Sequence, residues 1–208
     1  MKVAIITVDE LKEEWMSQGV QEEAKIEWIA EPKIVEEADC YIDLLFLPDD
    51  DRINKLKKLQ PAFIIVNSVN ATLKNLPGNF IRMNGWPTFL KRAVVEASCS
   101  NEDMKTKAEI IFKAFNKSTE WVPDVPGFIS ARVISMIINE AYFTLDEKVS
   151  SKSEIDTAMK LGTNYPYGPF EWSEKIGLKN VYELLTTLSN IKSRYEPAAL
   201  LKKEALLS

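Results

Sequence analysis

Up to about residue 120, short apolar runs alternate with amphipathic stretches. The runs are rich in β-branched residues, which is typical of buried strands, whereas the stretches between them repeat apolar positions at helical spacing. We expect strands at residues 2–8, 24–30, 40–47, 63–67, 80–83 and 93–97, and helices at 10–18, 52–59 and 101–116. Strands that alternate with short helices predict a parallel α/β sheet.

The pattern changes after a connector at residues 121–126, because no strand is expected beyond Gly127. Helices are expected at residues 128–147, 153–161 and 179–192, and others open near 168 and 197. The helix at 128–147 carries apolar residues around most of its circumference, which predicts burial in a bundle or at a subunit interface. We therefore expect an α/β domain in residues 1–122 and an all-helical domain in residues 123–208.

Several residues mark expected helix ends. The run Asp49-Asp50-Asp51 precedes the helix at 52–59 and is interpreted as its N-cap rather than as a metal site. Pro61 is expected to end the same helix. Ser153 is the expected N-cap of the helix at 153–161, and Gly162 its terminator.

Composition and charge narrow the functional classes. The chain of 208 residues has a net charge of −5, and nucleic-acid binding is not expected because phosphate contacts need clustered Lys and Arg. The apolar runs are too short to span a membrane, and residues 2–8 are interpreted as a strand rather than as part of a signal peptide. Two cysteines, Cys40 and Cys99, are too few for a disulfide framework, so we expect a reducing, cytoplasmic location.

The most distinctive motif lies in residues 124–178. It begins with Asp-Val-Pro-Gly-Phe and continues through a Gly- and Pro-punctuated helical hairpin. These residues resemble the C-terminal domain of 3-hydroxyacyl-CoA dehydrogenases. The matching positions are Asp124, Pro126, Gly127, Phe128, Arg132, Asn139, Glu140, Ala141, Ile155, Asp156, Ala158, Met159, Gly162, Pro166, Gly168, Pro169, Phe170, Gly177 and Leu178.

The N-terminal half resembles the nucleotide-binding domain of the same family. The stretches that carry this likeness are Ala38-Asp39-Cys40-Tyr41-Ile42-Asp43, Asn67-Ser68-Val69-Asn70 and Asn84-Gly85-Trp86-Pro87. The resemblance implies a trimmed Rossmann-like α/β domain followed by a helical domain of the 3-hydroxyacyl-CoA dehydrogenase C-terminal type. It also implies a homodimer formed through the helical domain. NAD is the cofactor that the resemblance implies, with Glu31 and Asn67 as candidate binding residues.

Departures from the family pattern affect the cofactor site. The glycines that let a backbone approach a diphosphate in the family fall on Thr7, Asp9 and Lys12. The Asp9 carboxylate would stand where the diphosphate is expected, and like charges about 4 Å apart near a protein surface repel by about 4 kcal/mol. The span 31–38 is also too short for the helical excursion that helps the family to hold coenzyme A. We therefore expect no bound cofactor.

The family's catalytic residues are also replaced. The histidine base falls on Ile81, and the chain contains no histidine at all. The substrate-orienting serine falls on Val69, and the asparagine after the Pro-Gly-Phe motif falls on Ala131. The glutamate that pairs with the histidine falls on Ala93 in an ungapped count. A small gap would instead put Glu96 there, so Glu96 is the one catalytic candidate.

Three functional hypotheses remain from the sequence. The first is a family member without dehydrogenase chemistry that acts as a dimeric ligand-binding or regulatory protein in acyl-CoA or fatty acid metabolism, with an acyl-CoA or a protein as its ligand. The second is an active NAD-dependent 3-hydroxyacyl-CoA dehydrogenase with atypical site residues. The third is an enzyme of this fold that uses Lys91, Glu96 or a tyrosine as its acid or base. Asn139 and Glu140 are interpreted as hydrogen-bonded structural residues.

Overall fold

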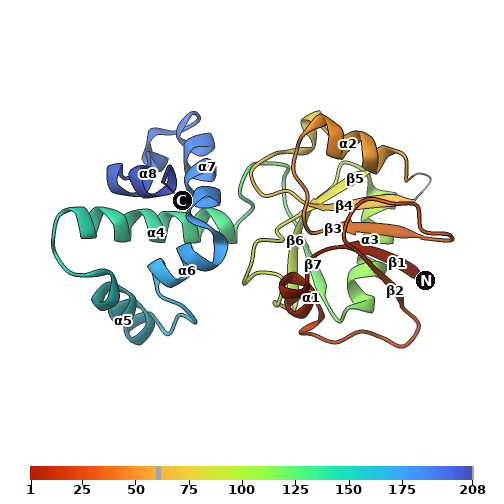
Figure 1. Ribbon diagram of the computed structural model, residues 1–208, viewed down its shortest axis with the longest axis horizontal. Helices are drawn as coiled ribbons and strands as arrows, with labels where there is room; N and C mark the ends of the chain where they lie inside the picture. Colours follow the sequence, from red (N-terminus) through yellow and green to blue (C-terminus); the bar gives the residue numbers. More distant parts are fainter. Residues whose placement is uncertain (60–61, 208) are drawn as a thin grey trace. The chain divides into compact units, whose positions relative to one another are not determined.

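The computed structural model describes residues 1–59 and 62–207, which divide into two compact units, Met1–Phe128 and Ile129–Ser208 (Figure 1). The boundary expected from the sequence lies slightly earlier, at residues 122–123. The expected terminator Pro61 lies outside the described residues. Among the helices described, none is long and apolar enough to cross a membrane.

Unit 1 is built on one sheet, which contains seven strands within the described residues. The strands are β1 (Lys2–Ile6), β2 (Lys25–Ile29), β3 (Cys40–Asp43), β4 (Phe63–Asn67), β5 (Phe80–Met83), β6 (Val94–Ser98) and β7 (Ser118–Trp121). The helices are α1 (Asp9–Met16), α2 (Asp50–Lys57) and α3 (Glu102–Ala114), with a 3-10 turn η1 (Leu73–Asn75). The spatial order is β2-β1-β3-β4-β5-β6-β7. Strand β2 therefore lies on one side of β1 and the later strands on the other, so the strand order reverses between β1 and β3.

Both faces of the sheet are buried, because successive residues of β1 point alternately into two apolar cores, one on each face. Val3 and Ile5 pack on the side that α1 and α3 cover, with Trp15 of α1 and Phe112 of α3 in the same cluster. The neighbouring residues of β1 point to the other face, which α2 covers through Leu56. This two-sided burial explains the continuous apolar runs in the sequence.

The predicted fold class is confirmed, but the sheet is not wholly parallel. Strands β5 and β6 run antiparallel, with Met83 opposite Ala97, and the other pairs in the sheet are parallel. Strand β7 was not predicted, because its sequence Ser-Thr-Glu-Trp has little apolar character and lies at an edge. Strand β3 ends at Asp43 rather than at Leu47.

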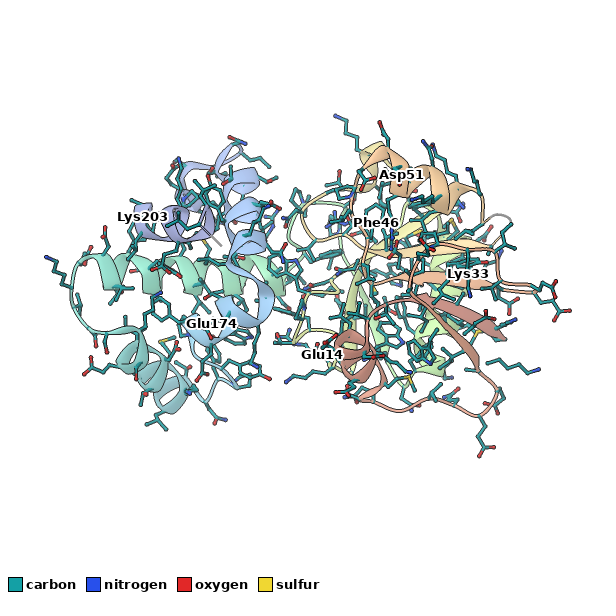
Figure 2. The ribbon with its side chains drawn as sticks, in the orientation of Figure 1. Glu14, Lys33, Phe46, Asp51, Glu174 and Lys203 are labelled. Atoms are coloured by element: carbon teal, nitrogen blue, oxygen red, sulfur yellow. The ribbon has the colours of Figure 1, made fainter. Side chains whose placement is uncertain are left out.

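The loop between β5 and β6, residues 85–93, is held by Glu14 of α1 and by Lys117, which follows α3. Glu14 lies on α1, where Figure 2 labels it. Both of its carboxylate oxygens accept from the N–H of Thr88, at 2.9 and 2.7 Å. The Lys117 ammonium donates to the carbonyl oxygens of Leu90 and Arg92, at 2.6 and 2.9 Å. Thr88 has a φ of 75°, a conformation that a β-branched residue adopts only under strain. The surrounding contacts therefore impose the path of this loop.

In the described residues of unit 2, the regular secondary structure consists of helices alone, which loops connect. Its elements are α4 (Ser130–Asp146), α5 (Lys152–Thr163), α6 (Pro169–Ile176), α7 (Leu178–Ser189), a 3-10 turn η2 (Ser193–Tyr195) and α8 (Ala199–Ala205). The helices α6, α7 and α8 all contact α4, which forms the axis of the unit (Figure 1). Asn139 of α4 is buried and bridges to the segment before α8, since it donates to Glu196 O and accepts from Ala198 N. The structural interpretation of Asn139 is thereby confirmed, whereas Glu140 is exposed.

Helix α5 starts and ends differently from the expectation. Ser151, not Ser153, is the N-cap, and Ser151 and Glu154 form a reciprocal capping box. The helix continues through Gly162 and stops at Asn164, whose left-handed φ of 55° ends it. Helix α4 is also less buried than its composition suggested, because Ile129, Val133 and Phe143 are exposed.

The first prediction concerns the buried Lys117. Burial lowers the pKa of its ammonium group to about 8 from 10.5, and Glu14 partly opposes this shift. Between these two pH values the unfolded chain binds more protons than the folded chain at this residue, so the free energy of unfolding should rise with pH. Comparison with Lys117→Met isolates the effect from other titrating groups.

We expect the difference in unfolding free energy, wild type minus Lys117→Met, to grow between pH 8 and 10, as measured by urea denaturation. A difference that falls over this range would contradict the assignment. At all pH values the variant should be the less stable protein, because it leaves two loop carbonyl groups without their donor.

The second prediction compares two glycines of unit 2. A Cβ at Gly168 would collide with the side chain of Asp156, whose carboxylate accepts from the N–H groups of Phe170 and Glu171 at the start of α6. Gly168→Ala should therefore destabilise the protein by about 1–3 kcal/mol. Gly162→Ala is the matched control, since Gly162 lies within α5 and a Cβ there meets nothing within 4 Å. It should stabilise by about 0.5–1 kcal/mol, and equal effects in urea denaturation would refute the analysis.

Candidate functional site

The ends of β1, β3, β4 and β5 meet at one edge of the sheet. In open parallel sheets ligands bind at this edge, at the point where the strand order reverses, which here lies between β1 and β3. Thr7, Asp43, Asn67 and Asn84 are the polar residues at or just after these strand ends. They define the candidate site.

At the end of β1, acidic residues occupy the first turn of α1. Asp9 and Glu10 are exposed there, and the N-cap Val8 makes no side-chain hydrogen bond. The two carboxylates already complement the positive end of the helix dipole. Lys12, the third position at which the family has glycine, extends over the ring of Trp28 with its ammonium 4.9 Å from the ring centroid.

At the end of β3, a fully buried carboxylate is paired with a guanidinium group. Asp43 accepts two hydrogen bonds from Arg52 of α2, at 2.8 and 2.7 Å, and a third from the N–H of Leu45. Burial raises the pKa of Asp43, although Arg52 and the Leu45 N–H act in the opposite direction. This bidentate pair fixes α2 against the sheet.

Asn67 at the end of β4 ties three strand ends together. Its Oδ1 accepts from the N–H of Gly85 at 3.0 Å, and its Nδ2 donates to the carbonyl of Leu44 at 3.2 Å. Gly85 is required at this point, because a Cβ there would lie only 2.7 Å from Asn67 Cγ. Both ends of the amide are thus engaged by backbone groups. Glu31, the other cofactor candidate, is exposed in the bend after β2.

The structure brings Glu96 together with Asn84. Nδ2 of Asn84 donates to a Glu96 carboxylate oxygen at 3.0 Å, and the backbone N–H of Asn84 donates to the Glu96 carbonyl at 2.9 Å. The antiparallel pairing of β5 and β6 continues directly into this contact. Ala93, the alternative to Glu96, is exposed near the start of β6. The residue opposite Glu96 is therefore Asn84, a partner that sequence reasoning missed.

Ile81 and Val69, which the sequence count set at the positions of the family's histidine and serine, are both buried. Ile81 has no exposed surface and belongs to the core beneath α1 and α3. Val69 is buried as well. The count was anchored on Asn84-Gly85-Trp86-Pro87, and this register put Asn84 outside the catalytic set.

Arg82 of β5 supports this edge from below. Its guanidinium is fully buried and donates to the Asp124 carboxylate at 2.8 Å and to the carbonyl oxygens of Ser68, Val69 and Val125 at 3.0 to 3.2 Å. The ring of Phe128 lies 4.2 Å from the guanidinium carbon. The motif at residues 124–128 is thus fastened to the turn after β4. Arg82 also explains why Asp124 is part of the motif.

A metal centre is not formed by the described part of the chain, where no group of three or more His, Cys, Asp or Glu residues could hold an ion.

Comparisons with known proteins agree with this architecture. Residues 127–206 match the family model described as 3-hydroxyacyl-CoA dehydrogenase, C-terminal domain. The fold of the chain resembles (S)-3-hydroxybutyryl-CoA dehydrogenase from Ralstonia eutropha, with a TM-score of 0.77 at 20% sequence identity over 99% of this chain and 93% of that one. At this identity the likeness supports the fold alone.

Two curated relatives are similar in sequence. The 3-hydroxyadipyl-CoA dehydrogenase of Escherichia coli K12 is 38% identical over 120 residues, which cover 56% of this chain and 25% of the relative. The probable 3-hydroxybutyryl-CoA dehydrogenase of Bacillus subtilis is 32% identical over 138 residues, which cover 64% of this chain and 48% of the relative. The matched region thus spans about a quarter of the first relative and about half of the second.

These findings agree with the motif in residues 124–178 and with the strand order of unit 1. Residues 127–206 are a C-terminal domain of the 3-hydroxyacyl-CoA dehydrogenase family, and the homologues of the chain are 3-hydroxyacyl-CoA dehydrogenases.

Proposed function

We propose that this protein is a member of the 3-hydroxyacyl-CoA dehydrogenase family that does not catalyse hydride transfer and acts as a dimeric binding protein for an acyl-CoA. The pairing of Glu96 with an amide, Asn84, carries the proposal. The chain contains no histidine that another segment could contribute.

An amide cannot replace the base of a dehydrogenase. Oxidation of an alcohol needs a group that takes up the hydroxyl proton as hydride leaves, and such a group works best with a pKa near the operating pH. The amide oxygen of Asn84 accepts hydrogen bonds but does not hold a proton at neutral pH. The Glu96 carboxylate is already engaged by the Asn84 Nδ2.

The residues at the start of α1 do not fit the diphosphate of NAD. Thr7, Asp9 and Lys12 each carry a side chain where the family's phosphate turn has hydrogen atoms. The carboxylates of Asp9 and Glu10 lie in the first helical turn, where a diphosphate would need bare N–H groups. These features support a protein that has lost the cofactor site.

The ligand class comes from the relatives. The two curated relatives described above are named for 3-hydroxyadipyl-CoA and 3-hydroxybutyryl-CoA. An acyl-CoA is therefore the ligand that we propose for this chain. The alternative, an active dehydrogenase, is favoured by the same names and by the 38% identity to the Escherichia coli enzyme. One cofactor titration separates the two.

The proposal includes a homodimer formed through α4. Ile129, Val133 and Met136 follow one another at spacings of four and three residues, and Phe143 lies one heptad beyond Met136, as in a helix–helix seam. Ile129 and Val133 are each more than half exposed, and Phe143 is exposed as well. Burying this stripe would remove apolar surface from water.

Charges beside the stripe suit a second copy of the chain. Arg132 and Glu140 lie at equal sequence distances on either side of Met136. They line one groove together with Val133 and Ile137. Two copies of α4 that cross antiparallel at Met136 would place each Arg132 opposite the partner's Glu140. Such an isologous contact would form the Arg132–Glu140 pair twice across the interface.

The test of the catalytic proposal is a titration with NADH followed by nicotinamide fluorescence, together with an assay of acetoacetyl-CoA reduction. We expect no saturation below about 100 μM NADH and no turnover. The melting temperature should rise with an acyl-CoA, because a ligand that binds only the folded state stabilises it. An NADH affinity tighter than about 100 μM, near 5.5 kcal/mol, would restore the dehydrogenase hypothesis. So would turnover that Glu96→Ala abolishes.

The dimer is tested by a charge exchange on α4. Glu140→Arg should set Arg132 against an arginine in the other copy and dissociate the dimer, which analytical ultracentrifugation would detect as a loss of the larger species. The double variant Arg132→Glu with Glu140→Arg should restore assembly by reversing both charges. A wild-type protein that sediments as a monomer would refute the proposal. So would a double variant that stays dissociated while its melting temperature is unchanged.

A further inference from the structure

The Glu96 carboxylate fixes the orientation of the Asn84 side chain. An ionised carboxylate only accepts hydrogen bonds, so the end of the amide that faces Glu96 at 3.0 Å must be the Nδ2 donor. The backbone hydrogen bond from Asn84 N to Glu96 O holds the two residues in register. The opposite end of the amide, Oδ1, must therefore point away from Glu96 as an acceptor.

Within the described part of the chain, Asn84 Oδ1 is buried and has no hydrogen-bond partner. The whole residue is only 5% exposed. A buried polar atom without a partner costs about 1–3 kcal/mol, so native proteins rarely leave one unless a ligand or an ordered water supplies the missing group. The atom needs a donor, because an amide oxygen offers lone pairs and no proton.

A second orphan acceptor follows β4. Asn70 Oδ1 is also buried without a partner among the described residues. It lies just after Ser68, whose N–H donates to the carbonyl of Met83 next to Asn84. The ends of β4 and β5 therefore carry two unsatisfied acceptors at the edge where this class of sheet binds ligands.

We propose that Asn84 Oδ1 accepts a hydrogen bond from the hydroxyl group of the ligand, so that the site selects a 3-hydroxyacyl-CoA over the corresponding 3-oxoacyl-CoA. This inference rests on the proposed function, because it takes an acyl-CoA as the ligand. The alcohol supplies the O–H that Oδ1 lacks. A ketone would set its own oxygen against Oδ1 and leave two acceptors facing each other. No bond is broken, and the site distinguishes the reduced from the oxidised ligand by binding alone.

Fixed orientation is what makes this selectivity possible. A free asparagine can turn its amide to offer Nδ2 to a ketone or Oδ1 to an alcohol. Turning Asn84 would place Oδ1 against the Glu96 carboxylate and lose a charge-assisted hydrogen bond. Sites built to pair with one polar group reject an analogue that lacks it far more strongly than apolar pockets reject a change in size. Glu96 thus acts as a positioning residue for Asn84.

The experiment is calorimetric titration of the purified chain with 3-hydroxybutyryl-CoA and with acetoacetyl-CoA, without any dinucleotide. We expect the hydroxy ligand to bind at least about tenfold more tightly. In Glu96→Gln the new amide can donate to Oδ1 and release the orientation of Asn84, so the affinity ratio should fall toward one. Glu120→Gln is the matched control, since Glu120 is exposed on β7 directly beside Glu96 in the sheet, and it should keep the wild-type ratio.

Each outcome has a distinct meaning. Equal affinity for the two ligands, as expected if a water satisfies Oδ1, overturns this inference and leaves the proposed function standing. A preference for acetoacetyl-CoA, or a preference that persists in Glu96→Gln, also overturns it. Binding of neither ligand refutes the proposed function and this inference with it. Asn84→Ala provides a second variant should Glu96→Gln fail to fold, and it should likewise abolish the preference.

Discussion

The buried guanidinium of Arg82 is the interaction on which the rest of unit 1 depends. A charge with no exposed surface is tolerated only when it is paired and its donors are satisfied. Here one carboxylate and three backbone carbonyl oxygens meet that need. They belong to the turn after β4 and to the motif at residues 124–128, so a single side chain joins segments far apart in sequence. Removal of either charge would leave the other without its partner.

The candidate site adjoins this network, because Arg82 lies in β5 and Asn84 directly follows this strand. Arg82 sets the turn after β4, Asn67 ties the ends of β3, β4 and β5, and the 85–93 loop is fixed by Glu14 and Lys117. Asn84 directly precedes that loop, and Glu96 lies within β6, which follows it. These polar side chains therefore hold the backbone around the pair. Among the described residues, Asn84 Oδ1 is buried and has no hydrogen-bond partner, so a donor must come from elsewhere.

Most of the fold follows from the sequence, because burial on both faces of a sheet leaves a strong apolar signal. The directions of β5 and β6 do not follow, since apolar runs do not record strand direction. Thr88 carries no turn signal either, because a β-branched residue with positive φ is held by its contacts and not by its own preference. Strand β7 was not predicted because its sequence has little apolar character. The N-cap of α5 could have been predicted from the sequence, since Ser151 and Glu154 have the spacing of a capping box.

The site could be predicted only in part. Glu96 was a candidate because a small gap in the count brings it to the position of the family's glutamate, and its catalytic role stays a prediction. Asn84 was assigned to a neighbouring motif. What sequence alone cannot supply is the pairing across β5 and β6, and this pairing decides which residue faces Glu96.

The antiparallel turn from β5 to β6 also bears on how the molecule assembles. Asn84 and Glu96 are separated by 12 positions in the chain, whereas Arg82 and Asp124 are separated by 42. Closing a short segment costs less entropy than closing a long one, and local contacts form early during folding. The two ends of the polar pair can therefore meet within a nascent hairpin, before the distant motif has docked. The chemistry of the candidate site thus depends on a contact that is more local in sequence than the one that holds the distant motif.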